Sequence, residues 1–437
     1  MKYFFYSIIV IFILLLTAVT IYLSTVGHET SSFNNLIVKE IAKKEPKIKL
    51  KLGKIKIKLD VKKIQLFITT RNPEILYENI KVPITRIEVH SKIKKILSSK
   101  IEISQIVFAV EKFRIQDVQK IAVRIKPSNF KTYLLNNFEG GEIEKALFDL
   151  EIDKNFKLTN YKAKGTIKKV KTKIKNNFII QDLGFNFIVD SNLTLINSIK
   201  ANYEGFSISN GSINLQRKKN LEIKGKFNTQ FEIKQNQLKK IFKKIKFFQL
   251  NKIETQGKFL HEFNLKINNS LKVIDYDYKS SGNIQQSQII LKDSLKTSFI
   301  ERPISKILFD KTKIKINFNK ENSNLLIFDG MYSTDESNYK KFKIENNLSR
   351  KNQIYSIDLN LTENIFFDVI NFKTNSKKIS NIKSVLNIKN KKYIFESIDL
   401  REGKNSIFVE GLVLNSKNEI EKVKNINLIT FNNKKKK

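Results

Sequence analysis

The chain has 437 residues, with 81 Lys or Arg against 42 Asp or Glu, which gives a formal net charge of +39. It contains no cysteine, and this excludes disulfide bonds, thiolate metal ligands and a cysteine nucleophile. So large a positive charge is typical of proteins that bind polyanions. However, Lys, Asn, Ile and Phe are abundant together while Trp is missing, so we interpret most of the lysines as ordinary solvent-facing residues.

Residues 3–23 form the longest apolar stretch and carry no charge. About twenty helical residues, at roughly 1.5 Å each, cross roughly 30 Å of hydrocarbon. The stretch predicts an uncleaved membrane anchor, and Lys2 favours a cytoplasmic start. The alternative is a cleaved signal peptide, but residues 23–29 offer no A-x-A cleavage site. The anchor residues are Tyr3, Phe4, Ile8, Ile11, Leu14, Leu15, Val19 and Tyr22.

Residues 31–45 have apolar positions at helical spacing and predict a short amphipathic helix before Pro46. In residues 48–59 apolar residues alternate with lysines at period two, interrupted at Gly53, which predicts strands with one apolar and one charged face. Similar runs predict strands within 64–69, 80–82, 87–89 and 101–108, with a short helix over 91–100.

The remaining sequence repeats a strand-like texture without a fixed period. Many of these alternating runs contain one glycine, which marks a bulge, a bend or a close backbone approach, as in a long sheet that must curve. Helices are predicted over 129–138, 235–250, 299–309 and 363–372. The basic amphipathic helix at 235–250 could lie on an anionic membrane, but we favour a helix that caps the sheet.

No catalytic constellation is present. The three histidines at positions 28, 90 and 261 are scattered, and we interpret them as structural. Residues 335–337 read as a small acidic loop and nothing more specific. The sequence also lacks a Walker loop, a nucleophile elbow and a dinucleotide fingerprint. We therefore predict no enzyme, no catalytic residue, no metal and no cofactor. Nucleic acid is not an expected partner, because the lysines are spread along nearly every strand.

The alternating pattern leaves two arrangements open. A sheet with one apolar face can close against a second sheet, or it can curl into a trough with that face inward. A trough of Ile, Leu, Val and Phe suits acyl chains, because burial favours hydrocarbon by about 0.8 kcal/mol per CH₂. The residues alone do not separate the trough from the closed sandwich.

The segments IKLKLGKIKIKLDVKKIQLFI (48–68) and NIKVPITRIEVHSKIKKILSSKIEISQIVF (79–108), placed after an anchor and before long meanders, resemble a known family. They are similar to the large AsmA-like proteins of the Gram-negative envelope, especially the long members of the YhdP and TamB type, which begin like chorein-type bridge-like lipid-transfer proteins. The resemblance implies an inner-membrane protein whose periplasmic β-groove conducts phospholipid toward the outer membrane, or which otherwise influences outer-membrane assembly. It supplies no catalytic residue.

One departure from the family is size, since its long members are much larger and no C-terminal module for the outer membrane is evident here. Three alternatives stay open: the protein crosses only part of the periplasm, the sequence is an incomplete part of a longer protein, or the protein works with a partner. We expect an anchor over 1–24, a groove start over 25–126 and an extended β-meander groove over 127–437, which is incomplete at its C-terminus under the second alternative.

We therefore expect a mainly β protein, in which an N-terminal transmembrane helix precedes a long, curved antiparallel β-groove with a few flanking helices. It is expected to lie in the bacterial inner membrane, with most of the chain in the periplasm, and to bind or guide phospholipid. The alternative is a non-enzymatic assembly or scaffold factor that binds envelope proteins. The expected start of the groove lining is Ile48, Leu50, Ile55, Ile57, Leu59, Ile87, Val89, Ile101 and Ile103.

Overall fold

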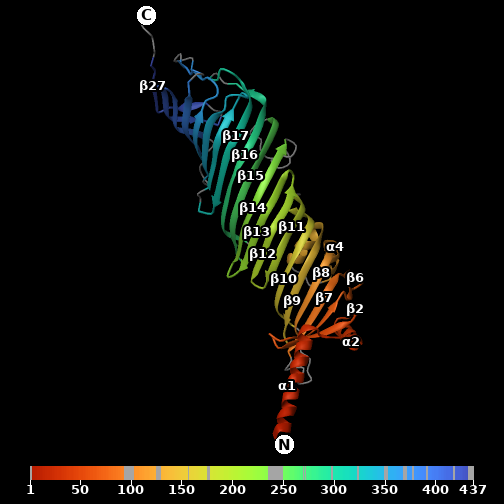
Figure 1. Ribbon diagram of the computed structural model, residues 1–437. Helices are drawn as coiled ribbons and strands as arrows, with labels where there is room; N and C mark the ends of the chain where they lie inside the picture. The colour runs from red at the N-terminus through yellow and green to blue at the C-terminus, as the bar shows by residue number, and fades with distance from the viewer. Residues whose placement is uncertain are drawn as a thin grey trace. The chain divides into compact units, whose positions relative to one another are not determined.

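The computed structural model (Figure 1) describes residues 2–92, 103–124, 129–155, 157–174, 178–234, 250–268, 270, 272–296, 299–321, 324–348, 353–367, 372–375, 378–389, 392–416 and 419–431. The protein is mainly β, as expected, and 22 of its strands belong to one antiparallel sheet. The chain divides into two compact units. Unit 1 comprises residues 1–201 and 212–217, and unit 2 comprises residues 202–211 and 218–437.

Unit 1 begins with α1 (Lys2–Thr25), which is long and apolar enough to cross a membrane. Its large side chains are exposed along almost its whole length, as a lipid-facing helix requires. Within the helix, the hydroxyls of Thr17 and Thr20 donate to the carbonyl oxygens of Ile13 and Leu16. These two hydroxyls therefore have a hydrogen-bond partner that hydrocarbon does not provide.

Two further helices and several strands of unit 1 agree with the prediction, whereas the helix over residues 115–123 was not predicted. The helix predicted over 31–45 is α2 (Asn34–Lys44), and the one predicted over 129–138 is α5 (Asn129–Asn137). A small sheet is formed by β2 (Ile48–Lys51), β5 (Glu74–Tyr77) and β6 (Ile80–Val82). The large sheet is formed in this unit by β1 (His28–Thr30), β3 (Ile55–Asp60), β4 (Gln65–Arg71), β7 (Ile84–Lys92), β8 (Ile103–Arg114), β9 (Phe138–Ile152), β10 (Leu158–Ile174), β11 (Phe178–Asp190) and β12 (Leu193–Tyr203).

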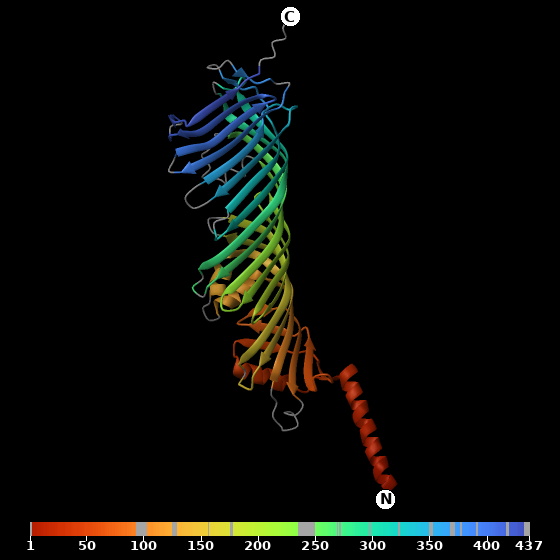
Figure 2. The same cartoon turned by 90° about the vertical axis from the view of Figure 1, so that its left-hand side faces the viewer.

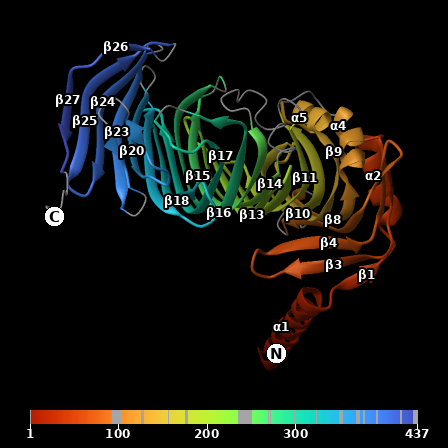
Figure 3. The same ribbon diagram turned by 90° about the horizontal axis from the view of Figure 1, so that it is seen from above.

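These strands pair antiparallel in the order β1, β3, β4, β7, β8, β9, β10, β11. Figure 3 shows the sheet of unit 1 bent around α5 and α4 (Ile115–Val123). The two helices pack on each other through Ile115, Ala122 and Leu134, and partly buried Phe138 and Ile143 of β9 lie against this cluster. The boundary expected after residue 126 thus falls between two helices that share one core.

In unit 2, long antiparallel strands lie side by side with a marked twist (Figure 2). Strand β13 (Phe206–Arg217) contributes to both units. Pairing then runs in sequence order from β14 to β20, and on through β23, β24 and β25. The strands are β14 (Leu221–Lys234), β15 (Leu250–Ile267), β16 (Val273–Leu295), β17 (Ile304–Asn319), β18 (Asn324–Ser333), β19 (Lys340–Leu348), β20 (Gln353–Asn360), β23 (Ser380–Lys389), β24 (Lys392–Glu402), β25 (Asn405–Leu414), β26 (Ile420–Lys422) and β27 (Asn425–Ile429).

Two predicted helices are wrong. Residues 304–309 of the helix predicted over 299–309 begin strand β17, because Thr312, Ile314 and Ile316 continue an alternation that pairs along β16. In place of a helix over 363–372, β21 (Phe366–Phe367) pairs with β22 (Phe372–Lys373) in a short hairpin. The helix predicted over 235–250 lies outside the described residues except for Leu250, which begins β15. Residues 93–100 of the helix predicted over 91–100 lie outside them as well, and its first two residues, 91 and 92, belong to strand β7 instead.

Glycines within the strands allow aromatic rings to lie close to the sheet. Gly225 is directly opposite Phe263, and Gly282 is directly opposite Phe259. A Cβ added at Gly282 would lie 2.2 Å from the backbone oxygen of Lys258 and 2.5 Å from the Phe259 ring. The close backbone approach expected at such glycines is present. The same arrangement of an aromatic ring opposite a glycine occurs at Gly165 with Phe187 and at Gly257 with Phe231.

We expect Gly282→Ala to lower the free energy of unfolding by about 1–3 kcal/mol, because the methyl group meets a backbone oxygen that cannot move aside. The midpoint of urea unfolding, followed by circular dichroism, measures this change. The matched control is Gly53→Ala, since a Cβ there meets no atom within 4 Å. Equal midpoints for the two variants would contradict the proposed close approach.

Candidate apolar binding face

One face of the sheet in unit 1 is apolar on successive strands. The registers place Ile57 of β3 opposite Ile68 of β4, and Ile68 opposite Val89 of β7. Val89 in turn pairs with Ile106, and Ile106 with Leu150. Because side chains directly opposite each other in a sheet share a face, these residues form one apolar row. Further residues of this apolar face are Ile55, Leu59, Leu66, Ile87, Phe108, Ala146, Phe148, Ala163, Phe187 and Val189.

The structure brings six of the nine predicted lining residues onto this face. Ile55, Ile57, Leu59, Ile87 and Val89 lie there directly, and a bulge in β8 sets Ile103 opposite Ser91, which pairs with Leu66. Ile48 and Leu50 alternate as predicted but belong to the separate three-stranded sheet, where they pair with Tyr77 and Ile75. Ile101 lies outside the described residues.

Unit 2 continues the same separation of faces. Starting from Ile314 of β17, the registers give Phe328, Ile344, Ile357 and then Ser384 on the next four strands. Ser384 is opposite Ile398, and Ile398 is opposite Val409. Sequence reasoning assigned no lining residue in this unit, although the alternation in β14 to β25 was available as a signal. The apolar face here also includes Ile223, Phe227, Phe231, Phe259, Phe263, Ile284, Ile289, Ile316, Phe318, Leu326, Phe342, Leu359, Ile382, Leu386, Phe395, Leu400, Ile407 and Leu412.

Most of these side chains are half-buried, which is the burial that neighbours within one sheet provide. Within the described ranges, no second large sheet packs on this face. It is covered locally in each unit. In unit 1, α4 and α5 cover it near Ile143. In unit 2, Phe367 and Phe372 of the β21–β22 hairpin form a core with Ile382, Leu400 and Ile407.

The opposite face carries the lysines. Lys226 pairs with Glu262 at 2.8 Å and Lys266 with Asp275 at 3.3 Å, and in both cases the two residues are directly opposite each other in the register. Each such exposed pair contributes about 0–1 kcal/mol. The strands therefore place their charge in water, and many lysines already have an acidic neighbour, as the solvent-facing interpretation predicts.

The apolar face of unit 2 includes a polar residue, His261, whose hydrogen bonds lie within the protein. His261 lies on the apolar face of β15, stacked on Phe227 with the ring centroids 4.7 Å apart. Its Nε2 is 2.7 Å from the Thr229 hydroxyl, and its Nδ1 is 2.8 Å from the Tyr278 hydroxyl. Burial lowers the pKa of His261 and raises that of Tyr278. The imidazole therefore stays neutral and satisfied among aromatic rings, which is a structural role.

The other two histidines have different surroundings, and the Nε2 of His90 lies 3.7 Å from a Glu88 carboxylate oxygen. His28 is exposed on β1, and His90 is buried on the face opposite to Val89, stacked on Phe67 with a centroid distance of 4.9 Å. No group of three or more His, Cys, Asp or Glu suited to a metal occurs within the part of the chain that the structure describes.

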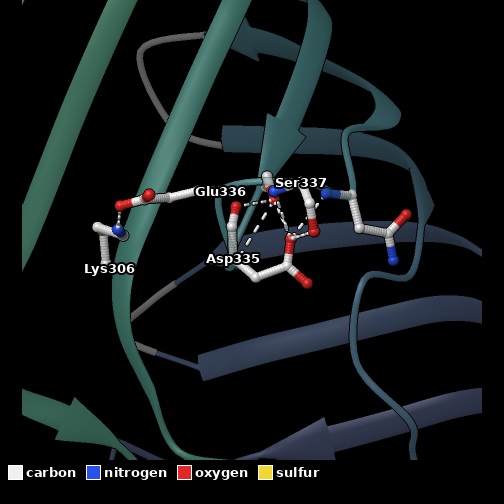
Figure 4. Close-up of polar contacts among 6 residues, drawn as sticks. Lys306, Asp335, Glu336 and Ser337 are labelled. Carbon is white, nitrogen blue, oxygen red and sulfur yellow. Dashed lines mark hydrogen bonds and ion pairs between the residues drawn. The ribbon is translucent and has the colours of Figure 1, made fainter.

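The polar face of unit 2 holds a hollow of about 730 Å³ over β14 to β17. Its lining includes Glu232, Glu254, Gln286 and Asp310, and the β18–β19 loop contributes Glu336 and Tyr339. Glu336 is held 2.5 Å from Lys306, whereas Asp335 accepts the backbone N–H groups of Ser337 and Asn338 within its own loop (Figure 4). In the acidic loop predicted at 335–337, the Asp335 carboxylate therefore stabilises its own turn, and the Glu336 carboxylate pairs with Lys306.

No protein-family model, curated protein or solved structure matches this chain.

The lowered pKa of His261 predicts a pH dependence of stability. The unfolded chain protonates this residue near pH 6.5, whereas the folded protein does so at lower pH. The free energy of unfolding should thus fall as the pH drops through and below 6.5. In His261→Gln, which keeps hydrogen-bonding groups but does not titrate, this component should be missing from the difference between urea midpoints at pH 7.5 and pH 5. An equal pH dependence in both proteins would contradict a neutral, buried imidazole.

Proposed function

We propose that this protein binds phospholipid acyl chains along the apolar face of its sheet and guides them by a non-enzymatic mechanism. The observation that carries the proposal is the register: strand after strand sets an apolar residue opposite an apolar residue, while the opposite face carries the charge. Half-buried Ile, Val and Phe side chains remain for a ligand to cover, and each CH₂ group buried there stabilises the complex by about 0.8 kcal/mol.

A membrane lipid is the apolar ligand that agrees best with the rest of unit 1. Helix α1 is long and apolar enough to span a bilayer, and it ends three residues before β1, which pairs with β3 of the apolar face. Lipid leaving the bilayer would meet apolar strand residues close to the point where the chain itself leaves it. Charged headgroups would remain in water beside the lysines at the margins of the sheet.

The proposal includes the setting that the sequence resemblance implies. We propose an AsmA-like protein of the bacterial inner membrane, with its strands in the periplasm and with phospholipid as cargo toward the outer membrane. Catalysis, a metal and a cofactor have no part in this function. A scaffold or assembly factor that binds envelope proteins is the second candidate, and it predicts an apolar face without lipid.

Photocrosslinking from the two faces tests the proposal. We expect a benzoylphenylalanine at Ile316, on the apolar face of β17, to form adducts with phospholipid in membranes of cells that produce the full chain. The matched control places the same residue at Lys315, the neighbouring exposed position on the polar face. Mass spectrometry of the purified protein identifies the adduct.

Two further variants measure how much the lipid depends on this face. We expect Ile316→Asp to reduce the amount of copurified phospholipid several-fold, because an acyl chain that covers a carboxylate removes its hydration at a large cost in free energy. Lys315→Asp should leave the amount of phospholipid unchanged. Circular dichroism verifies that both variants fold. Adducts with proteins alone at Ile316, or equal lipid adducts from both faces, would reject lipid binding and favour the scaffold.

A further inference from the structure

The turn between β3 and β4 exposes apolar side chains. It consists of Val61, Lys62, Lys63 and Ile64, in which Val61 is 54% and Ile64 68% exposed. Ile64 has a φ of 51°, which a β-branched residue rarely adopts. The backbone N–H of Lys63 donates to Asp60 at 3.1 Å and fixes the turn. A constrained turn thus presents two aliphatic side chains and two lysines outward.

The register places this turn beside the end of α1. Strand β1 is antiparallel to β3, with His28 opposite Ile57 and Thr30 opposite Ile55. The chain before His28 therefore lies beside the residues that follow Ile57, on the way to the turn. A direct contact agrees, because the Lys58 ammonium donates to the Thr25 carbonyl oxygen at 3.3 Å. Val61 follows three residues later, about 10 Å along the strand.

A second exposed apolar group lies at the same end of unit 1. Phe33 and Leu36, at the start of α2, are 49% and 60% exposed. Figure 1 shows α2 and β2 at the end from which α1 projects, and Figure 3 shows β3 and β4 next to α1. We name Phe33, Leu36, Val61 and Ile64 the basal residues.

The charges around the basal residues favour an anionic surface. Lys62 and Lys63 are exposed in the turn, Lys54 is exposed at the other end of β3, and α2 contributes Lys39 and Lys43. Of the acidic groups close by, Glu29 pairs with Lys56 at 3.0 Å, and Asp60 accepts the Lys63 backbone N–H. Glu40 of α2 and Glu45 directly after it are exposed and offset part of the positive charge on that helix. Aliphatic side chains flanked by lysines are the composition of segments that lie in the headgroup layer of a membrane.

We infer that the basal residues rest in the interfacial layer of the same bilayer that α1 crosses, with Lys62 and Lys63 on lipid phosphates. This inference rests on the proposed function and deepens it, because it names the place of lipid entry. Leu59 and Leu66, which pair on the apolar face next to the turn, then lie at the level of the headgroups. An acyl chain can pass from the bilayer to the sheet there without crossing open water.

The absence of cysteine allows a direct depth measurement. Single cysteines replace Val61, Val123 or Leu15 in the full chain, and each receives an environment-sensitive fluorophore. The proteins are reconstituted in vesicles of zwitterionic and anionic phospholipid that carry a nitroxide quencher high or low on the acyl chain. Val123 is the matched control, because it is a valine that is 59% exposed on α4, away from the end that bears α1.

We expect the probe at Val61→Cys to be quenched several-fold more than that at Val123→Cys, and more by the shallow quencher than by the deep one, since interfacial segments enter roughly 5–10 Å. Adding Lys62→Ser and Lys63→Ser should reduce the quenching. The probe at Leu15→Cys should respond to the deep quencher.

The outcomes separate this inference from the proposed function. Quenching at Leu15→Cys with equal, weak quenching at Val61→Cys and Val123→Cys overturns basal contact, while lipid crosslinks at Ile316 would still support the proposed function. A lack of quenching at Leu15→Cys shows that α1 is outside the bilayer and overturns both the anchor and the basal contact.

Discussion

The structure depends on the antiparallel register between neighbouring strands. Side chains alternate between the two faces of a strand, so a slip of one residue would exchange the apolar and the charged sets. In this chain the pairing keeps Ile, Val and Phe together over successive strands, and bulges restore the match where it would fail. At Ile143, for example, a register shift between β9 and β10 sets Ile143 opposite Ile167.

The apolar face of this sheet is covered over only part of its length. Most β proteins bury the apolar face of a sheet against a second layer. Here the cover is local: α4 and α5 in unit 1, and the β21–β22 hairpin in unit 2. Between these covers the apolar side chains rely on lateral neighbours, and aromatic rings lie close to the backbone of opposing glycines such as Gly225 and Gly282. A face of this kind gains free energy when a flexible apolar ligand covers it.

This arrangement of faces explains where most of the positive charge of the protein lies. Lysines occupy the polar face because the alternation puts them there, and partners such as Glu262 and Asp275 neutralise part of their effect. At the base of unit 1, by contrast, Lys62 and Lys63 lie between the exposed Val61 and Ile64, beside the end of α1. The same residue type is thus ordinary solvent-facing charge along the strands and a candidate lipid contact at one turn.

The sequence by itself determined the elements whose signal is local. The anchor follows from the length of an uncharged apolar stretch, and the strands follow from period-two alternation. The helices α2 and α5 follow from apolar residues at helical spacing, close to proline or glycine residues that end a helix. The two wrong helices at 299–309 and 363–372 have short apolar runs, for which periodicity does not distinguish helix from strand until a partner strand is known. Six of the nine predicted lining residues share one face, because the alternation along a strand also determines to which face of the sheet each side chain points.

Only the tertiary structure decided which strands pair and what covers the apolar face. The alternation of Ile48 and Leu50 equals that of Ile55 and Ile57, yet β2 joins a separate sheet with β5, because strand partnership depends on contacts distant in sequence. The neutral His261 between Thr229 and Tyr278, and the exposed turn beside α1, likewise arise from register across strands. Local composition fixes the two faces of a strand, whereas long-range hydrogen bonds fix which faces are joined.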